Sequence, residues 1–354
     1  MLPERLEPGF VREGRFFALP LSVPGECDPI DPDASYLTTL TLAGDGTSVY
    51  AASSGGRACH VVQAALLGPV GMVLDLGVIP NAIEVRFLVA LADDAWGDSI
   101  LVGVRHAGGS QVWLGHTRHL HDTIQEPHFL YPEFTLVGNF HGILLHDGIH
   151  QPDGSLLVLC DAGLACWHQT DGVTWITKDP ELFSSAVPRL LRLSPNTVVW
   201  IAANGAITTV TGEPFAQLPQ ALDAGATACV DRSSSTEHLI VFNADGIAWR
   251  VGRNDVKPLG KTVLAPVRAA AVIADGRIFV CCGDGIAHWD CFEPTNNRWR
   301  DLGAVVATLP QPRYGLSFAA IMPGPHGEMW LAENDRGGCL WLYHPAYPTP
   351  VRIT

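Results

Sequence analysis

The sequence has few charged residues, and bases are the rarer kind. Only 16% of the 354 residues are charged, with 22 Lys and Arg against 36 Asp and Glu, which gives a formal net charge of −14. Nucleic acids and anionic membrane surfaces attract proteins through a positive field. The composition therefore argues against nucleic acid or a membrane as a general partner, while leaving room for a local basic site.

Long apolar runs and paired cysteines are also missing. No hydrophobic run reaches the length of a membrane span, and residues 1–7 carry charge where a secretion signal needs an apolar core. The nine cysteines are irregularly spaced and none forms a CxxC pair. We therefore expect a soluble, cytoplasmic protein with free thiols.

Several signatures of catalysis are absent. The chain contains no GxSxG elbow, phosphate-binding P-loop, dinucleotide fingerprint or HExxH sequence. No segment has the periodicity of a long amphipathic helix. Strands must therefore build the core of a chain that is 47% hydrophobic.

What the sequence does contain is a repeat. Seven short hydrophobic segments recur at a mean spacing of about 47 residues, and a turn with glycine follows each one closely. The segments are SVYAAS (48–53), SILVGV (99–104), SLLVLC (155–160), VVWIAA (198–203), HLIVFN (238–243), RIFVCC (277–282) and EMWLAE (328–333). A short strand between turns is typical of an antiparallel meander.

The repeat predicts an all-β fold, a single seven-bladed β-propeller over residues 1–354 with four-stranded antiparallel blades. The expected blades are 36–80, 85–140, 141–180, 187–219, 226–260, 267–303 and 315–345. The last blade lacks an outer strand, and residues 15–21 (RFFALPL) precede the first blade without a partner. We expect this N-terminal strand to complete the last blade and close the ring.

Propeller ligands usually bind where inner strands begin and where second strands turn into third strands. At these positions the sequence offers Arg86, Arg105, Arg189, Arg268, Arg313, Asn204 and Glu333. Arginine matches carboxylate and phosphate groups with paired donors, so the set predicts an anion-binding funnel. The alternative is that these arginines pair with neighbouring acids or line a water-filled channel.

A histidine-rich stretch suggests a metal. His116, His119 and His121 lie close together beside Asp122, and neutral imidazoles with a carboxylate are typical ligands of Zn²⁺, Mn²⁺ or Ni²⁺. A divalent metal is therefore a candidate cofactor, and an exposed His-rich loop is the simpler alternative. His141 is expected to open an inner strand and to face the funnel, where nearby arginines would favour its neutral form.

Two resemblances bear on function. The turns resemble those of the seven-bladed propeller superfamily, including its WD40/YVTN-like members, and GPHGEMWL (324–331) is similar to the GPDGxxWF element of virginiamycin B lyase-like proteins, with His326 in place of Asp. The residue types at the mouth resemble those of propeller lyases that act on uronates, such as oligogalacturonate and ulvan lyases. That likeness implies that Arg189, Arg268 and Arg313 neutralise a carboxylate, His141 abstracts a proton and Tyr314 protonates the leaving group.

The sequence thus leaves two classes of function open. One is a lyase or related enzyme acting on a small anionic sugar or carboxylate. The other is a propeller without catalysis that binds a small anionic ligand or a protein partner at the same face.

Overall fold

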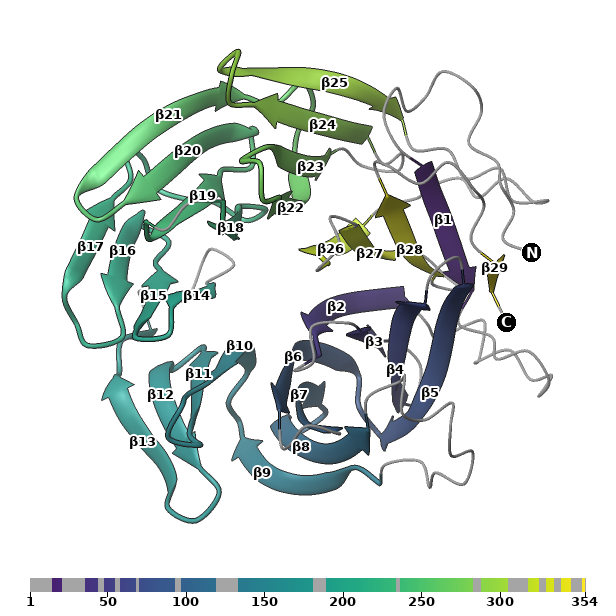
Figure 1. Ribbon diagram of the computed structural model, residues 1–354. Coiled ribbons are helices and arrows are strands. Elements are labelled where there is room, and N and C mark those ends of the chain that lie inside the picture. Colours follow the sequence, from purple (N-terminus) through teal and green to yellow (C-terminus); the bar gives the residue numbers. More distant parts are fainter. Residues whose placement is uncertain are drawn as a thin grey trace. The chain divides into compact units, whose positions relative to one another are not determined.

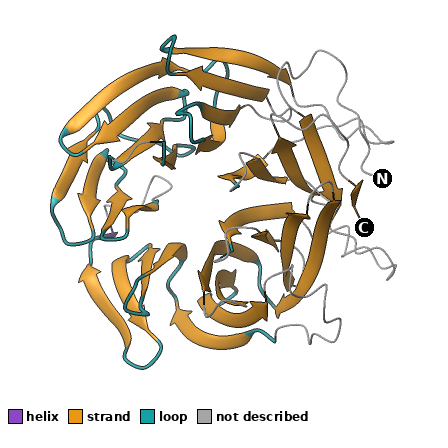
Figure 2. Cartoon of the chain, in the orientation of Figure 1, coloured by secondary structure: helices purple, strands orange, loops and turns teal. Residues whose placement is uncertain are grey.

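The protein was analysed as a computed structural model. The structure describes residues 15–20, 36–43, 48–54, 58–67, 70–92, 97–118, 133–180, 189–233, 236–282, 288–304, 318–324, 329–333, 339–344 and 352–353. Apart from one helical residue at position 180, the elements in these ranges are β-strands, arranged in seven sheets (Figure 2). The described residues include no helix long and apolar enough to cross a lipid bilayer. The predicted all-β fold is confirmed.

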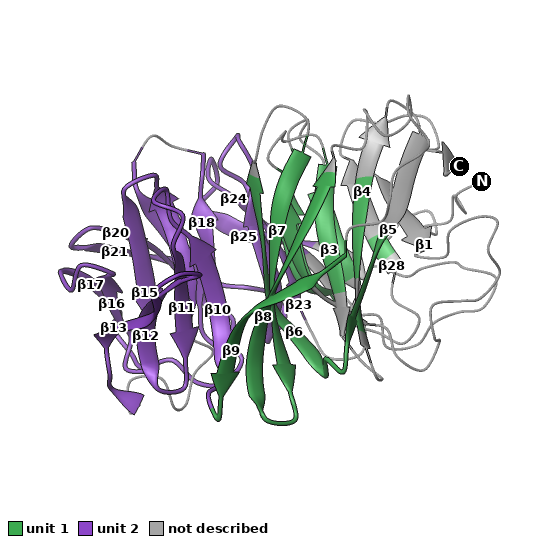
Figure 3. Ribbon diagram, turned by 90° about the horizontal axis from the view of Figure 1, so that it is seen from below, with its two compact units in different colours: residues 1–142, 306–354 green, residues 143–305 purple. Residues whose placement is uncertain are grey.

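The chain divides into two compact units, residues 1–142 with 306–354 and residues 143–305 (Figure 3). The first unit holds three sheets. Their strands are β2 (Tyr36–Leu42), β3 (Ser48–Ser54), β4 (Ala58–Leu67), β5 (Val70–Pro80) and β29 (Arg352–Ile353); β6 (Glu84–Ala92), β7 (Gly97–His106), β8 (Gly109–Arg118) and β9 (Thr135–His141); and β26 (Phe318–Pro323), β27 (Met329–Glu333), β28 (Cys339–His344) and β1 (Arg15–Pro20).

The second unit holds four sheets of four strands each (Figure 1). They are β10 (Leu145–His150), β11 (Leu156–Cys160), β12 (Gly163–His168) and β13 (Gly172–Thr177); β14 (Leu190–Ser194), β15 (Thr197–Ile201), β16 (Ala206–Thr209) and β17 (Pro214–Gln217); β18 (Thr227–Asp231), β19 (His238–Phe242), β20 (Ile247–Gly252) and β21 (Asp255–Lys261); and β22 (Val267–Val272), β23 (Ile278–Cys282), β24 (His288–Glu293) and β25 (Arg298–Ala304).

The N-terminal strand completes the C-terminal sheet, as the sequence predicts. β1 pairs with β28 in antiparallel register from Arg15↔His344 to Pro20↔Cys339. This pairing gives the last sheet its fourth strand and covers an edge of β28 that would otherwise stay open. The first strand of each sheet corresponds to the predicted inner strand, and the fourth to the predicted outer strand.

The second strands form the centre of the core. β11 and β23 are buried along their whole length, and in β19 only His238 is partly exposed. A strand covered on both faces reads as a continuous apolar run. For this reason the second strands are the clearest part of the repeat in the sequence.

The fourth strands share a β-bulge that inserts one apolar residue. In six sheets, two consecutive residues of the third strand pair with residues of the fourth strand that are two positions apart. One residue of the fourth strand is therefore left without a register partner. The inserted residues are Leu76, Val137, Ile176, Phe215, Leu259 and Leu302. At three of these bulges the inserted side chain packs on the next sheet of the same unit: Leu76 clusters with Ile100, Phe215 with Leu239 and Leu259 with Ile278.

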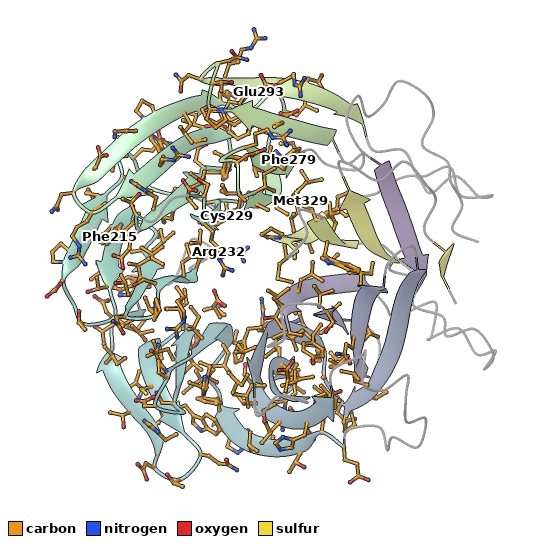
Figure 4. The ribbon with its side chains drawn as sticks, in the orientation of Figure 1. Phe215, Cys229, Arg232, Phe279, Glu293 and Met329 are labelled. Carbon is orange, nitrogen blue, oxygen red and sulfur yellow. The ribbon has the colours of Figure 1, made fainter. Side chains whose placement is uncertain are left out.

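The packing of Phe215 shows the effect of this bulge most clearly. Its ring is fully buried, and it clusters with Leu239 and Trp249 of the following sheet. Figure 4 labels Phe215 on β17 and Cys229 on the neighbouring first strand β18. The inserted side chain therefore acts as a packing contact between consecutive sheets.

Candidate functional site

In the first unit, two arginines converge on one glutamate. Glu84 opens β6 and is the register partner of Arg105 near the end of β7. Glu84 Oε1 lies 3.1 Å from Arg86 Nη1, and its Oε2 lies 3.4 Å from Arg105 Nε. The three side chains are 26–39% exposed, so the group is partly open to solvent. The predicted ligand-binding residues Arg86 and Arg105 are therefore brought together.

The backbone of β6 explains how Arg86 joins this group. Val85 pairs with Val104 and Phe87 with Gly103, which leaves Arg86 as the extra residue of a β-bulge. Side chains two positions apart in a strand point to the same face, so Arg86 can approach Glu84.

The group keeps donors that its own residues do not fully satisfy. Arg86 Nε and His106 Nε2 are buried without a hydrogen-bond partner among the described residues, and Arg105 Nε faces Glu84 Oε2 at 3.4 Å as an ion pair without hydrogen-bond geometry. His106 Nδ1 accepts a hydrogen bond from Gly108 N at 3.2 Å, so in the neutral ring Nε2 carries the proton. Two cations and one carboxylate leave a net charge of about +1 at this end of the sheet.

His141 lies at the same sheet end but not where the sequence placed it. The expected inner strand beginning near Phe140 is wrong: β9 ends at His141, and β10 begins at Leu145. His141 pairs with Gly109 and is exposed. Gly109 has φ +137°, and a Cβ there would lie 2.2 Å from Phe140 O, so only glycine allows the turn between β7 and β8 to approach β9 this closely.

In the second unit, Arg189 lies beside an acid. Asp147 Oδ2 accepts a 2.9 Å hydrogen bond from Leu190 N, and Asp147 Oδ1 accepts one of 2.9 Å from Gly148 N. Burial raises the pKa of the Asp147 carboxyl, although the Arg189 charge and the two backbone donors act in the opposite direction. Arg189 Nε is buried without a hydrogen-bond partner in the described part of the chain.

The other described ligand-binding candidates lie on or beside strands of three different sheets. Arg268 is exposed on β22, and Asn204 lies in the turn after β15, where its Oδ1 accepts a 2.9 Å hydrogen bond from Ala206 N. Glu333 ends β27. Arg313 and Tyr314 lie outside the described residues.

Three first strands have a basic residue at one bulge position. The bulge at Arg86 recurs near the start of β10 and β22, where the extra residues are His146 and Arg268. The same position holds Thr38 in β2 and Ala319 in β26. Two of the predicted cations, Arg86 and Arg268, therefore occupy equivalent positions in their sheets.

The predicted metal ligands are only partly described. His116 lies on β8, is exposed, and its Nδ1 is 2.9 Å from Ser99 Oγ, while His119 and His121 lie outside the described residues. Within the ranges given above, no group of three His, Cys, Asp or Glu side chains could hold a metal ion. The metal site stays a prediction.

The cysteines of the second unit have structural positions. Cys160, Cys281 and Cys282 are buried and not in disulfides. Burial, with Asp231 nearby, raises the pKa of Cys229 to about 12. A thiol with so high a pKa is a poor nucleophile, so these residues behave as small hydrophobic side chains.

Glu84 and Asp147 were missed by the sequence analysis. Glu84 lies two residues before Arg86, but its contact with Arg105 depends on the register of β6 against β7. Asp147 reaches the backbone of Leu190, 43 residues away. A search for acids one repeat before each candidate arginine would have found Asp147.

Comparison with known proteins shows the fold and nothing narrower. No protein family model and no curated protein matches the sequence. The chain is similar to the WD40 β-propeller domain of Doa1, with a TM-score of 0.54 and 12% identity over 92% of this chain and 96% of that one. It is also similar to the Dos1 propeller, with a TM-score of 0.51 and 11% identity over 98% and 99% of the two chains.

The resemblance to lyases stays a prediction, because these likenesses concern architecture alone. Seven sheets that each contain four antiparallel strands, a last sheet completed by the N-terminal strand and a structural likeness to propellers lead to one conclusion. The chain has the fold of a seven-bladed β-propeller.

Proposed function

We propose that this propeller is a recognition module that binds a carboxylate- or phosphate-bearing ligand at the group formed by Glu84, Arg86 and Arg105. The observation that carries the proposal is the excess of positive charge there: two partly exposed guanidinium groups share one carboxylate, at 3.1 Å and 3.4 Å. Charge-assisted hydrogen bonds from arginine to an oxyanion are among the stronger polar contacts in proteins.

Binding is proposed ahead of elimination chemistry because its residues form one described group. Glu84, Arg86 and Arg105 lie within one sheet and need no other part of the chain to bind an anion. A lyase would need a general base within hydrogen-bond reach of the proton that it removes, and His141 in that role stays a prediction.

A binding role also agrees with the fold. The two structural neighbours named above are propeller domains, an architecture that presents loops and strand ends from a rigid scaffold. A protein partner would bind the site through an acidic or a phosphorylated side chain. A small ligand would bind it through its own carboxylate or phosphate group.

The test is a binding panel of dicarboxylates, phosphorylated sugars and uronate oligomers, read by thermal shift and calorimetry. We expect one anion class to raise the melting temperature of the wild type, because a ligand that binds only the folded state stabilises it by mass action. Arg105→Gln should weaken that binding by about tenfold or more. The matched control is Arg253→Gln, which removes an exposed arginine that pairs with Glu213 at 3.5 Å in the other unit.

Three outcomes contradict the proposal. They are no binding by any anion class, equal losses in Arg105→Gln and Arg253→Gln, and conversion of a bound ligand to product. The last would restore the lyase hypothesis and direct attention to His141.

A further inference from the structure

One cysteine of the second unit differs from its buried neighbours. Cys166 lies on β12 and is partly exposed, whereas Cys160 on β11 and Cys282 on β23 are buried. Burial raises the pKa of the Cys160 and Cys282 thiols, which makes both of them poor nucleophiles. Of these three thiols, Cys166 is the most open to solvent.

An imidazole lies next to this thiol. Cys166 Sγ is 3.6 Å from His168 Nε2, within the range of a hydrogen bond to sulfur. The two residues are two positions apart in β12, so the pleat directs both side chains to the same face of the sheet. With the ring proton on Nδ1, Nε2 can accept the thiol proton, which is the arrangement that activates cysteine nucleophiles.

A carboxylate supports the charged form of this imidazole. Asp153, in the turn between β10 and β11, accepts hydrogen bonds from Ser155 Oγ at 2.7 Å and from Ser155 N at 2.9 Å. These bonds lower the pKa of Asp153, and the charge of His168 acts in the same direction to a lesser extent. An interaction between two charges is mutual. The ionised Asp153 therefore stabilises the imidazolium that forms when the thiol gives up its proton.

The same end of β12 leaves room for a small molecule. His168 pairs with Gly172 beside the turn between β12 and β13. No described atom lies within 4 Å of the place that a Cβ on Gly172 would take. Cys166 pairs with Thr174, an exposed residue of the outer strand β13. A small reagent can therefore approach the thiol and the imidazole from solvent.

We propose that Cys166, His168 and Asp153 form a site that reacts with small disulfide compounds and holds the product as a mixed disulfide. His168 takes the thiol proton as Cys166 Sγ attacks one sulfur of the disulfide. A new S–S bond forms to Cys166, the S–S bond of the reagent breaks, and the leaving sulfur departs as a thiolate that takes the proton back from His168. Cys166 is oxidised and the reagent is reduced, so the step needs no further oxidant.

The site lies in the second unit, and the inference does not rest on the anion site of the first unit. The test incubates the full chain at neutral pH with hydroxyethyl disulfide, an uncharged probe, and follows each thiol by tandem mass spectrometry. We expect the mixed disulfide to form at Cys166 at least about tenfold faster than at the buried Cys160. Dithiothreitol should then remove it by thiol–disulfide exchange.

Substitutions test the roles of the two neighbouring side chains. His168→Gln should slow the reaction at Cys166 by at least about tenfold, because the thiol loses its proton acceptor. Asp153→Asn should slow it several-fold. The matched control is His238→Gln, which removes a partly exposed imidazole on β19, with its Nδ1 2.8 Å from Thr236 Oγ1, and should leave the rate at Cys166 unchanged.

The buried Cys160 reports whether a variant is folded, since local unfolding would expose this thiol and speed its reaction. A variant in which Cys160 reacts at the wild-type rate keeps this sheet intact. If His168→Gln fails that check, Asp153→Asn decides the question. The inference is overturned if Cys166 reacts no faster than Cys160, if a folded His168→Gln or Asp153→Asn chain reacts at the wild-type rate, or if His238→Gln slows the reaction as much as His168→Gln.

Discussion

The Tyr50 hydroxyl donates a 2.7 Å hydrogen bond to Asp98 Oδ2, and both side chains are fully buried. Tyr50 belongs to β3 and Asp98 to β7, so the bond joins two consecutive sheets of the first unit. Gln63 Nε2 extends the network by donating to Tyr50 Oη at 3.4 Å and to Ser48 Oγ at 3.2 Å. Polar side chains this deeply buried need their partners, because an unmet hydrogen bond is costly away from water.

We predict that Tyr50→Phe lowers the free energy of unfolding by about 1–3 kcal/mol, because Asp98 loses a donor in a buried environment. Urea denaturation followed by tryptophan fluorescence measures the change. The control is Thr236→Val, which removes an exposed hydroxyl 2.8 Å from His238 Nδ1 and should change stability by less than about 0.5 kcal/mol. Equal effects of the two substitutions would contradict a structural role for the buried pair.

The bulge residues of the fourth strands give a second prediction. Leu76 is 1% exposed and packs on the following sheet, whereas Ile176, at the same bulge position in β13, is 43% exposed. We expect Leu76→Ala to cost about 2–5 kcal/mol through the lost contacts and the cavity. Ile176→Ala should cost less than about 1 kcal/mol, since much of that side chain is already in water. Chemical denaturation of both variants measures the difference, and a loss of similar size for both would show that burial of the bulge residue does not set its contribution to stability.

The strand pattern of the fold could be predicted because the same order of strands and turns recurs in every sheet. Second strands such as Leu156–Cys160 are buried on both faces, so they are continuous apolar runs, and glycine turns mark their ends. The N-terminal strand followed from counting strands in the last repeat. The bulges could not be predicted in this way, because a bulge such as the one at Arg86 is visible only when the register of two strands is known.

The same limit explains the errors at the candidate site. His141 reads as the start of an apolar strand, but the turn after it separates β9 from β10. The arginines were found because a cation near the start of a first strand stands out in an acidic chain. The acidic residues next to them were not found from the sequence. Glu84 contacts Arg105 through strand pairing, and Asp147 of one sheet contacts the backbone of Leu190 in the next.

Two aspartates of the second unit should respond to pH in opposite ways. Burial raises the folded-state pKa of Asp147 above its ordinary value of 3.8, so its stabilising contribution is present at low pH and is lost as pH rises through the folded pKa. Hydrogen bonds from the Ser155 hydroxyl and backbone N–H lower the pKa of Asp153, so its contribution is lost as pH falls through its folded pKa.

We therefore predict that the unfolding free energy of Asp147→Asn, relative to wild type, rises as pH increases upward from about 4. That of Asp153→Asn should fall as pH increases over the range below about 4. Urea denaturation between pH 3 and pH 7 measures both slopes. Slopes of the same sign in the two variants would contradict the opposite pKa directions of these carboxyl groups.

The role of Glu84 in the proposed anion site yields the last prediction. Its carboxylate lies within 3.1 Å of Arg86 and 3.4 Å of Arg105, in the position that a ligand carboxylate would need. If Glu84 competes with the ligand, Glu84→Gln should tighten anion binding several-fold, because it removes a negative charge and frees donors of both arginines. Arg86→Gln should weaken the same binding, and raising the salt concentration should reduce the difference between the variants, since these groups are partly exposed.

Calorimetric titration of wild type, Glu84→Gln and Arg86→Gln with the anion found in the panel decides the question. Weaker binding by Glu84→Gln would mean that the carboxylate holds the two arginines in place for the ligand, and the competitive arrangement would then be wrong.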